Sequence, residues 1–322
     1  MYRVLSVLMC TFAVFGCNAP PASSPAEPDS AAETPPPSET ALINAHFHSA
    51  LLGMDDAAYL ETVLAEMDAH NFTRSVLHIA EPSDLEDWVD AAPGRFLAGP
   101  AFPCWHNETG ALDKCDWNGA AWPDLDWMRE NYVSGRMQVM GEMLFVYAGI
   151  APTDPQMAPY WALAEELRVP VAIHINRGPP ANSPIRPAGC CPNFNADYGN
   201  PALLRPVLEQ HPELKVWLQH AGFPAMPIFD DIDYLEETYA LLADYPNIYV
   251  DMTALNAAAP PHVHAAAVQD FIDRGFGDRI MMGTDNWEAA PILERYNAFE
   301  FLTESQLRAI LHDNAARFFG LE

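Results

Sequence analysis

Histidines and carboxylates recur at one kind of position in the chain, where short apolar runs end. Six of them could bind a metal ion together: His46, His48, Glu142, His174, His220 and Asp285. Imidazole nitrogens and carboxylate oxygens are the ligands that zinc, manganese and iron take in proteins. His46 and His48 are two residues apart, so in a strand they point to the same face and can bind one ion. The sequence therefore predicts a divalent-metal site of one or two ions, with zinc expected first and manganese or iron as alternatives.

The apolar runs before these residues predict eight β-strands. We expect them at residues 41–48, 73–79, 95–102, 137–144, 169–175, 214–220, 247–253 and 279–285. Amphipathic segments that predict helices lie between them, for example at residues 57–69, 155–167, 201–210, 232–243 and 261–274. Several strands are almost continuously apolar, as in a parallel sheet covered on both faces. Strand followed by helix, eight times over, predicts a (β/α)8 TIM barrel in a single domain.

A doubly wound sheet is the competing fold. It would lead us to expect a Gly-rich phosphate-binding turn after the first strand, and no such pattern follows any of the strands. In a barrel, the carboxyl ends of all strands meet at one mouth, where substrates bind. The long segments at residues 103–121 and 176–199 are rich in Pro, Gly, Asn and Cys and would lie over that mouth. Arg177 lies in the second of them, where it could bind a substrate carboxylate or pair with a surface acid; both remain open.

The order and context of these motifs resemble the amidohydrolase superfamily. The shared features are HxH on the first strand, VAIHINRG around His174, VWLQHAG around His220 and MMGTDNW around Asp285. The closing ILHDNAARFFGL at residues 310–321 resembles the last helix of the amidohydrolase-related branch, which includes aminocarboxymuconate-semialdehyde decarboxylase. The resemblance covers nearly all of residues 41–322. It implies a metal-dependent hydrolase barrel with four metal ligands: His46, His48, His174 and Asp285. It also implies that His220 binds a second metal or polarises the substrate.

The fourth predicted strand departs from the pattern of many two-metal members of this superfamily, which carry a carboxylated lysine there. Here QVMGEM offers Glu142, which resembles the TatD-like members, where glutamate bridges the metals. The alternative is that Glu142 is an ordinary barrel carboxylate that does not bind metal. A buried carboxylate has to be paired in either case, because an isolated one is costly.

Three functions compete. The first is hydrolysis of a small ester, lactone, amide or phosphoester, with Asp285 accepting a proton from metal-activated water and His220 stabilising charge on the attacked oxygen. The second is non-oxidative decarboxylation, favoured by a single ion and by Arg177 on a substrate carboxylate. The third is a binding lipoprotein that has lost its chemistry. Retention of all six polar positions argues against the third.

Charge bears on the partners. Of the 322 residues, 16 are Lys or Arg and 44 are Asp or Glu, which gives a formal charge of −28. Such a surface repels phosphate backbones, so we expect a small-molecule substrate and no nucleic acid. Half of the residues are apolar, which excludes wholesale disorder. A homo-oligomer remains open.

The N-terminus predicts export. An apolar run at residues 4–15 follows a single Arg and is too short to span a bilayer, which is typical of a signal peptide. Residues 1–16 end in a pattern that resembles a lipoprotein cleavage box, with Cys17 as the lipidated residue. Residues 17–40, rich in Pro, Ala and Ser, predict a disordered tether between membrane and barrel. The expected location is the cell envelope, in the periplasm or at the cell surface, with membrane contact only through the lipid.

Four cysteines belong to the predicted barrel: Cys104, Cys115, Cys190 and Cys191. Disulfide bonds are permitted in an exported protein. Their connectivity does not follow from the sequence.

Overall fold

The computed structural model describes residues 41–49, 56–103, 115–178, 191–224 and 232–321. The predicted signal peptide, Cys17 and the predicted tether lie outside the described residues, as do Cys104 and Cys190. All of the described residues belong to one compact unit. Among them, none of the helices has the length and apolar character needed to cross a membrane.

Eight strands follow one another in chain order. They are β1 (Leu42–Asn44), β2 (Phe72–Ile79), β3 (Phe96–Pro100), β4 (Met140–Met143), β5 (Val171–His174), β6 (Val216–Gln219), β7 (Ile248–Asp251) and β8 (Ile280–Met281). Hydrogen-bonded ladders join β1 to β3 in one sheet and β4 to β8 in another, with every pair parallel. Each predicted strand is present, and most are shorter than expected at their ends.

Backbone hydrogen bonds join the two sheets at both seams. Gln138 N and Val139 N donate to Ala98 O, at 2.9 and 3.2 Å, which connects β3 to β4. At the other seam, Ala45 N donates to Met282 O at 2.9 Å and connects β1 to β8. The strands therefore close into a ring, and the prediction of a single-domain (β/α)8 barrel is confirmed.

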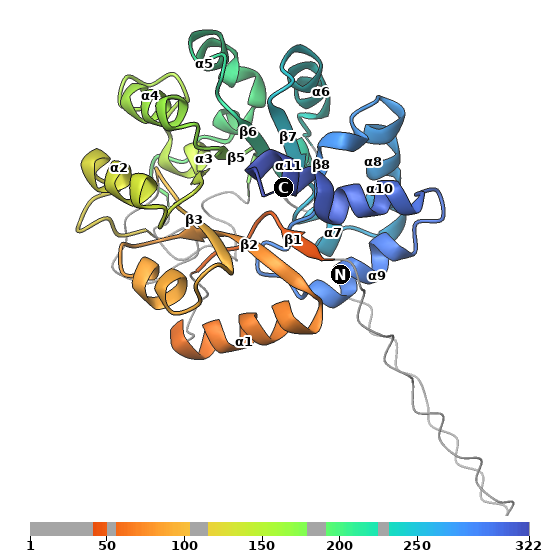
Figure 1. Ribbon diagram of the computed structural model, residues 1–322. Coiled ribbons are helices and arrows are strands. Elements are labelled where there is room, and N and C mark those ends of the chain that lie inside the picture. The colour runs from red at the N-terminus through yellow and green to blue at the C-terminus, as the bar shows by residue number, and fades with distance from the viewer. Residues whose placement is uncertain (1–40, 50–55, 104–114, 179–190, 225–231, 322) are drawn as a thin grey trace, which may run out of the picture. The chain divides into compact units, whose positions relative to one another are not determined.

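The longer helices lie outside this ring (Figure 1). The helices are α1 (Asp56–Ala69), α2 (Leu125–Ser134), α3 (Phe145–Ala148), α4 (Ala158–Leu167), α5 (Arg205–Gln210), α6 (Leu235–Asp244), α7 (Leu255–Ala258), α8 (Pro261–Asp273), α9 (Ala289–Asn297), α10 (Glu304–Arg308) and α11 (Asn314–Phe319). In the described part of the chain, two of them have a side-chain cap: Asp124 accepts from two backbone amides at the start of α2, and Thr303 accepts from one at the start of α10. The helix expected at residues 201–210 begins as a 3-10 turn, Pro201–Leu204, and continues as α5.

Apolar side chains fill the inside of the ring. One buried cluster takes members from seven of the strands and the segments that continue them: Ile43, Ala45, Val76, Leu97, Val139, Ala172, Trp217 and Met281. The last helix, α11, packs against this cluster, and the Trp217 ring lies 5.7 Å from that of Phe318 and 5.3 Å from that of Phe319. Figure 1 shows α11 lying across the ring of strands. The interior is therefore closed by apolar packing, which leaves the carboxyl ends of the strands for polar side chains.

His264 in α8 is a buried imidazole away from those strand ends. Neither of its ring nitrogens has a hydrogen-bond partner among the described residues. The ring packs against Tyr296 and Phe299, with centroids 4.8 and 5.0 Å away. Burial, helped by the charge of Arg295, lowers the pKa of His264 to about 3.

We expect His264 to make the fold sensitive to acid. The unfolded chain binds a proton at His264 below pH ~6.5, whereas the folded chain does so only near pH 3, so stability falls as pH falls between these values. Each pH unit costs about 1.4 kcal/mol, or about 2 kcal/mol between pH 7 and 5. His264→Phe should lose about 2 kcal/mol less than the wild type over this interval, measured by urea unfolding. His262→Phe, an exposed position on the same helix, is the control. Equal losses in wild type and His264→Phe would contradict the prediction.

Candidate functional site

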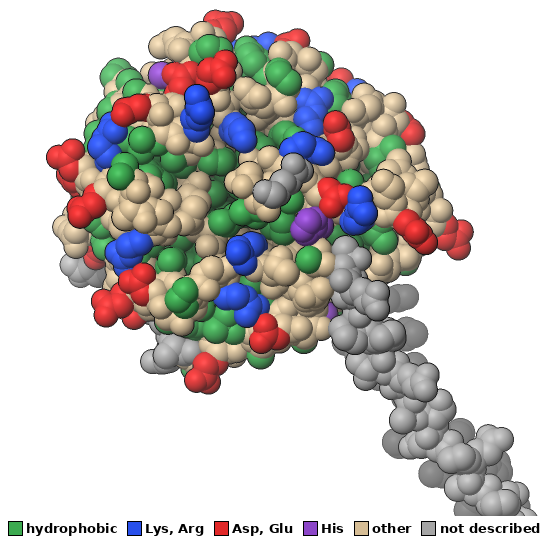
Figure 2. Space-filling view, viewed as in Figure 1, with side chains coloured by type: hydrophobic (Ala, Val, Ile, Leu, Met, Phe, Trp, Pro, Cys, Tyr) green, Lys and Arg blue, Asp and Glu red, His purple; other side chains and the backbone are tan. Residues whose placement is uncertain are grey.

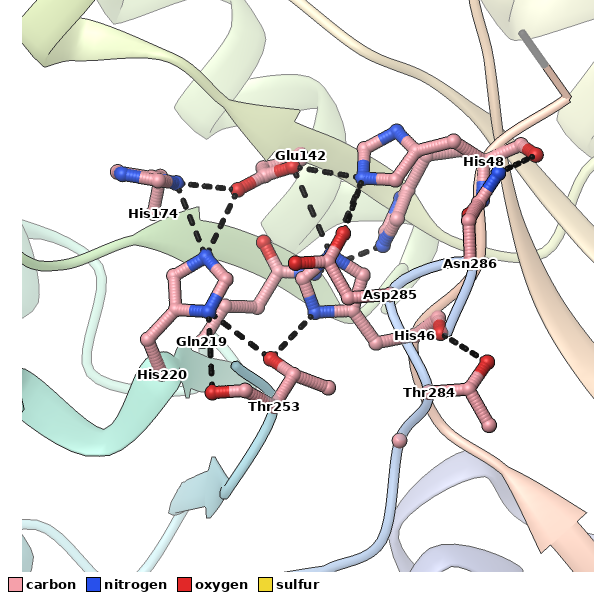
Figure 3. Close-up of polar contacts among 12 residues, drawn as sticks. His46, His48, Glu142, His174, Gln219, His220, Thr253, Thr284, Asp285 and Asn286 are labelled. Atoms are coloured by element: carbon pink, nitrogen blue, oxygen red, sulfur yellow. Dashed lines mark hydrogen bonds and ion pairs between the residues drawn. The ribbon is translucent and has the colours of Figure 1, made fainter. Parts of the chain in front are cut away.

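The six predicted metal-binding side chains come together at the carboxyl ends of the strands (Figure 3). His46 and His48 follow β1, Glu142 lies in β4, His174 ends β5, His220 follows β6 and Asp285 follows β8. His46 is fully buried, and the side chains of Glu142, His220 and His174 are 4, 7 and 9% exposed. Those of His48 and Asp285 are about a quarter exposed. The site is thus buried on one side and open to solvent on the other.

Four of the donor atoms form what we call the first donor set: His46 Nε2, His48 Nε2, Glu142 Oε2 and Asp285 Oδ1. The two histidine nitrogens are 3.1 Å apart. Glu142 Oε2 lies 3.6 and 3.1 Å from them, and Asp285 Oδ1 lies 3.6 and 3.5 Å from them. Two ligands bound to one zinc ion at about 2.1 Å in tetrahedral geometry lie about 3.4 Å apart. The spacing of these atoms therefore fits one metal ion.

The second donor set comprises Glu142 Oε1, His174 Nδ1 and His220 Nε2. His174 Nδ1 lies 2.6 Å from Glu142 Oε1 and 3.1 Å from His220 Nε2. His220 Nε2 is 3.6 Å from the same carboxylate oxygen. Glu142 therefore gives one oxygen to each set. The sets are adjacent, because ligand atoms of His46, Glu142 and His220 also lie within 4.8 Å of one another.

The chemistry of His174 tests whether this second set fits a cation. Its Nε2 lies 2.9 Å from Asn176 Oδ1, which also accepts from Gly178 N. Since that oxygen can only accept, Nε2 carries the proton, and in a neutral ring Nδ1 carries a lone pair. Nδ1 nevertheless faces Glu142 Oε1, another acceptor, at 2.6 Å. Two lone-pair atoms this close require a positive charge between them, which either a second proton on the ring or a divalent metal ion would supply.

Electrostatics point the same way. Burial alone would raise the pKa of Glu142. The hydrogen bond and positive charge of His174, followed by those of His220 and His46, outweigh this effect. The pKa of Glu142 therefore lies well below the usual range. For His46, burial lowers the pKa, while the charges of Asp285 and Asp251 more than offset this and hold it well above 6.5. The pKa of His220 is also raised, because Glu142 and Asp285 offset the effect of its burial, whereas burial lowers the pKa of His174. The site thus keeps its carboxylate ionised and favours positive charge on His46 and His220.

Close packing between β1 and β8 brings His46, His48 and Asp285 together. A Cβ on Gly283 would lie 2.7 Å from His46 Cβ and 2.6 Å from Thr253 Cγ2, so only glycine fits there. Beyond it, Asp285 N donates to His46 O at 2.9 Å. The Asn286 amide accepts from His48 N at 2.7 Å and donates to His48 O at 3.0 Å.

Arg177 lies beside the site but is not part of either donor set. Its Nη1 donates to Asp197 Oδ1 at 2.8 Å and to Tyr234 Oη at 3.3 Å. Of the two readings of this residue, the structure contains the ion pair with an acid, and Asp197 is 81% exposed. Residues 179–190, which follow Arg177, lie outside the described residues.

The sequence interpretation missed the residues directly behind the histidines. Asp251 ends β7 and Thr253 follows it, both fully buried. Asp251 could have been predicted from the sequence, because it is a charged residue at the end of an apolar strand. His78 is also buried here, and both of its nitrogens are used: Nδ1 donates to Gly141 O at 2.6 Å and Nε2 accepts from Gln219 Nε2 at 2.8 Å. His78 thus connects β4, which carries Glu142, with β6, which precedes His220.

Comparison with protein families shows to which family the chain belongs. The family model described as Amidohydrolase matches residues 25–321. The chain belongs to the amidohydrolase family. The expected superfamily is thereby confirmed. None of the curated proteins matches the chain.

Solved structures share the barrel. A probable 2-pyrone-4,6-dicarboxylic acid hydrolase from Acinetobacter baumannii is 16% identical, with a TM-score of 0.57 over 87% of this chain and 99% of its own. The 2,6-dihydroxybenzoate decarboxylase from Rhizobium is 18% identical, with a TM-score of 0.54 over 88% and 99%. A 5-carboxyvanillate decarboxylase from Novosphingobium aromaticivorans, complexed with manganese, is 14% identical, with a TM-score of 0.56 over 88% and 96%. At these identities the likeness shows the fold of this amidohydrolase and not its reaction.

We expect the first donor set to be required for metal binding. His48→Ala removes a partly exposed member of this set with little loss of packing. It should weaken metal binding by more than roughly 10- to 100-fold, which is the loss typical of a mutation behind a ligand. Metal content after dialysis and zinc affinity by competition titration would measure this. His262→Ala, an exposed histidine outside the site, is the control. Wild-type metal occupancy in a His46→Ala/His48→Ala double variant would contradict the assignment.

Proposed function

We propose that this amidohydrolase is a metal-dependent hydrolase of a small ester, lactone, amide or phosphoester. The observation that carries the proposal is the position of the Glu142 carboxylate, with one oxygen in each donor set. A carboxylate in this position suits two neighbouring ions, an arrangement that stabilises both the attacking and the leaving oxygen of a hydrolytic reaction. Zinc is the proposed metal, because nitrogen and carboxylate ligands suit it. The six proposed ligands are His46, His48, Glu142, His174, His220 and Asp285.

Asp285 is the proposed proton acceptor. When bound, a divalent metal supplies Lewis acidity, lowering the pKa of water and polarising the substrate oxygen. Glu142 and His46 are almost completely enclosed, whereas the Asp285 carboxylate is 26% exposed on the open side of the site. Asp285 can therefore take a proton from the attacking water and give it to the leaving group, the work of a general base and then a general acid.

His220 has two proposed roles that depend on the number of ions. With two ions it is a ligand through Nε2, in the second donor set. With one ion it faces the substrate and, in its doubly protonated form, stabilises negative charge on the attacked oxygen, as a donor held in place before the reaction. Its buried position, 7% exposed, strengthens either interaction by excluding water.

Non-oxidative decarboxylation is the second candidate, and Arg177 is the residue that favours it. Its ion pair with the exposed Asp197 is of a kind worth only about 0–1 kcal/mol. A substrate carboxylate could displace Asp197 and bind Arg177 through two parallel hydrogen bonds. In a substrate held in that way, at a site with one ion, the bond to the carboxylate carbon would break and release carbon dioxide. The carbon left behind would take up a proton from water, assisted by His220.

Asp285→Asn should separate proton transfer from metal binding. Asparagine keeps one ligating oxygen but cannot accept a proton at neutral pH. We expect kcat to fall by roughly 10²–10⁴, with a smaller change in metal affinity. The substrate panel comprises lactones, esters, amides, phosphoesters and aromatic carboxylic acids, assayed in ¹⁸O-labelled water with carbon dioxide measured in parallel. The exposed Asp87→Asn is the control.

The outcomes of this assay separate the two candidates. Incorporation of ¹⁸O into the product supports hydrolysis. Carbon dioxide release without ¹⁸O incorporation would overturn the hydrolase proposal in favour of decarboxylation. Near-normal turnover by Asp285→Asn would remove this residue from the proton-transfer role.

We also propose that the protein is an exported lipoprotein. Cys115 and Cys191 each take part in a disulfide bond, which supports an oxidising compartment. The proposal predicts that Cys17→Ser abolishes incorporation of labelled palmitate in a bacterial host. Cys10→Ser, which changes a cysteine inside the apolar run, should leave it unchanged. Labelling of Cys17→Ser at the wild-type level would contradict lipidation at this residue.

A further inference from the structure

Asp251 and Thr253 lie directly behind both donor sets. Both are fully buried, and neither belongs to a donor set. The Thr253 hydroxyl has three polar neighbours: Asp251 Oδ1 at 2.5 Å, His220 Nδ1 at 2.9 Å and His46 Nδ1 at 3.1 Å. One hydroxyl therefore contacts a histidine from each donor set, as Figure 3 shows for His46 and His220.

The single proton of the Thr253 hydroxyl fixes the direction of these hydrogen bonds. A hydroxyl donates once and accepts twice. Asp251 Oδ1 can only accept, since it already receives the backbone amides of His220 at 3.0 Å and Thr253 at 3.1 Å. The hydroxyl therefore donates to Asp251. Both histidine Nδ1 atoms must then donate to the hydroxyl oxygen.

The remaining contacts of each ring agree with this assignment. His46 Nδ1 also lies 3.2 Å from Asp251 Oδ2, an acceptor. His220 Nδ1 also lies 3.4 Å from the Thr253 carbonyl oxygen, another acceptor. With Nδ1 protonated in both rings, the lone pair of each neutral ring is on Nε2. His46 Nε2 faces the first donor set and His220 Nε2 faces the second.

We infer that Asp251 and Thr253 are a shared positioning pair, which fixes the Nδ1-protonated form of His46 and His220 and so presents Nε2 of both rings to the metal centre. The inference rests on the proposed metal-binding role of these two histidines. Partners behind a metal-binding histidine that fix its tautomer typically affect metal affinity by about 10- to 100-fold. Here one pair serves two histidines on opposite sides of the Glu142 carboxylate, so its loss should weaken both donor sets.

Asp251→Asn gives a specific expectation for His46. The position of Oδ1 accepts three donors, so the amide oxygen of asparagine should take that place. Its NH2 group would then point at His46 Nδ1 and donate to it. This moves the His46 proton to Nε2 and removes the lone pair that faces the first donor set.

Thr253→Val gives the complementary expectation for His220. Valine keeps the shape of threonine and removes the hydroxyl, so His220 Nδ1 loses its 2.9 Å acceptor. Thr253→Ser retains the hydroxyl and should rescue the defect. Thr238→Val is the matched control, because Thr238 is also fully buried and its hydroxyl has no partner among the described residues.

The experiment measures ring tautomers by ¹⁵N NMR of the protein before zinc is added, and then zinc affinity by competition titration. We expect Asp251→Asn and Thr253→Val to weaken zinc binding by about 10- to 100-fold, with Thr253→Ser within a few-fold of wild type. Wild-type spectra should show Nδ1 protonated in His46 and His220, and Asp251→Asn should change His46. The inference is overturned if Asp251→Asn leaves the His46 tautomer unchanged, or if Thr253→Val matches Thr238→Val.

Failure of the inference and failure of the proposed function give different results. Zinc binding with the expected tautomers, but no ¹⁸O incorporation from any substrate, would overturn the hydrolase proposal alone. A wild-type protein that binds no zinc would overturn both. Hydrolysis together with unaltered zinc affinity in both variants would overturn the positioning pair alone.

Discussion

The Glu142 carboxylate is the group on which the rest of the site depends. Its side chain is only 4% exposed, and it contacts both histidines that follow β1 as well as His174 and His220. An ionised carboxylate taken out of water costs several kcal/mol unless it is paired and hydrogen-bonded. Here the pairing has to come from positive charge among the imidazoles or from metal ions, because the carboxylate is held ionised. The histidines on the two sides of Glu142 are thus parts of one electrostatic arrangement.

The barrel can hold such an arrangement because its apolar packing and its charged side chains lie in different places. Apolar side chains and α11 fill the interior, and two hydrogen-bonded seams close the ring. The carboxyl ends of the strands can then carry charged side chains whose backbone is already fixed. Gly283 shows how closely the backbone packs around the site, since a single Cβ there would collide with both His46 and Thr253. The donor atoms are held at ligand spacing by the rigid scaffold, which reduces the reorganisation that metal binding requires.

The fold and the clustering of the six candidate ligands were accessible from the sequence for the same reason. An apolar run followed by a polar residue marks the end of a buried strand, and the i, i+2 spacing of His46 and His48 places both on one face. What lies behind these residues was not accessible. Asn44 bonds Thr284 across 240 residues of sequence, and Asn286 holds the backbone of His48 across 238. Amides and hydroxyls at strand ends also occur in ordinary loops, so only the three-dimensional contacts distinguish them. Arg177 is a similar case, since its partner Asp197 lies 20 residues further along the chain.

Asp251 and Asp285 show why residue type alone does not assign a role at this site. Asp251 ends β7 and Asp285 follows the neighbouring β8, and both lie close to His46. Asp251 is fully buried and already accepts from two backbone amides and the Thr253 hydroxyl, with His46 Nδ1 against its other oxygen. Few lone pairs of Asp251 therefore remain to bind a metal ion or to accept a proton. Asp285 is partly exposed, and its Oδ1 faces the Nε2 atoms of two histidines. The number of donors that each carboxylate already satisfies therefore separates the two, and it is the reason that we propose a positioning role for Asp251 and a metal-binding and proton-accepting role for Asp285.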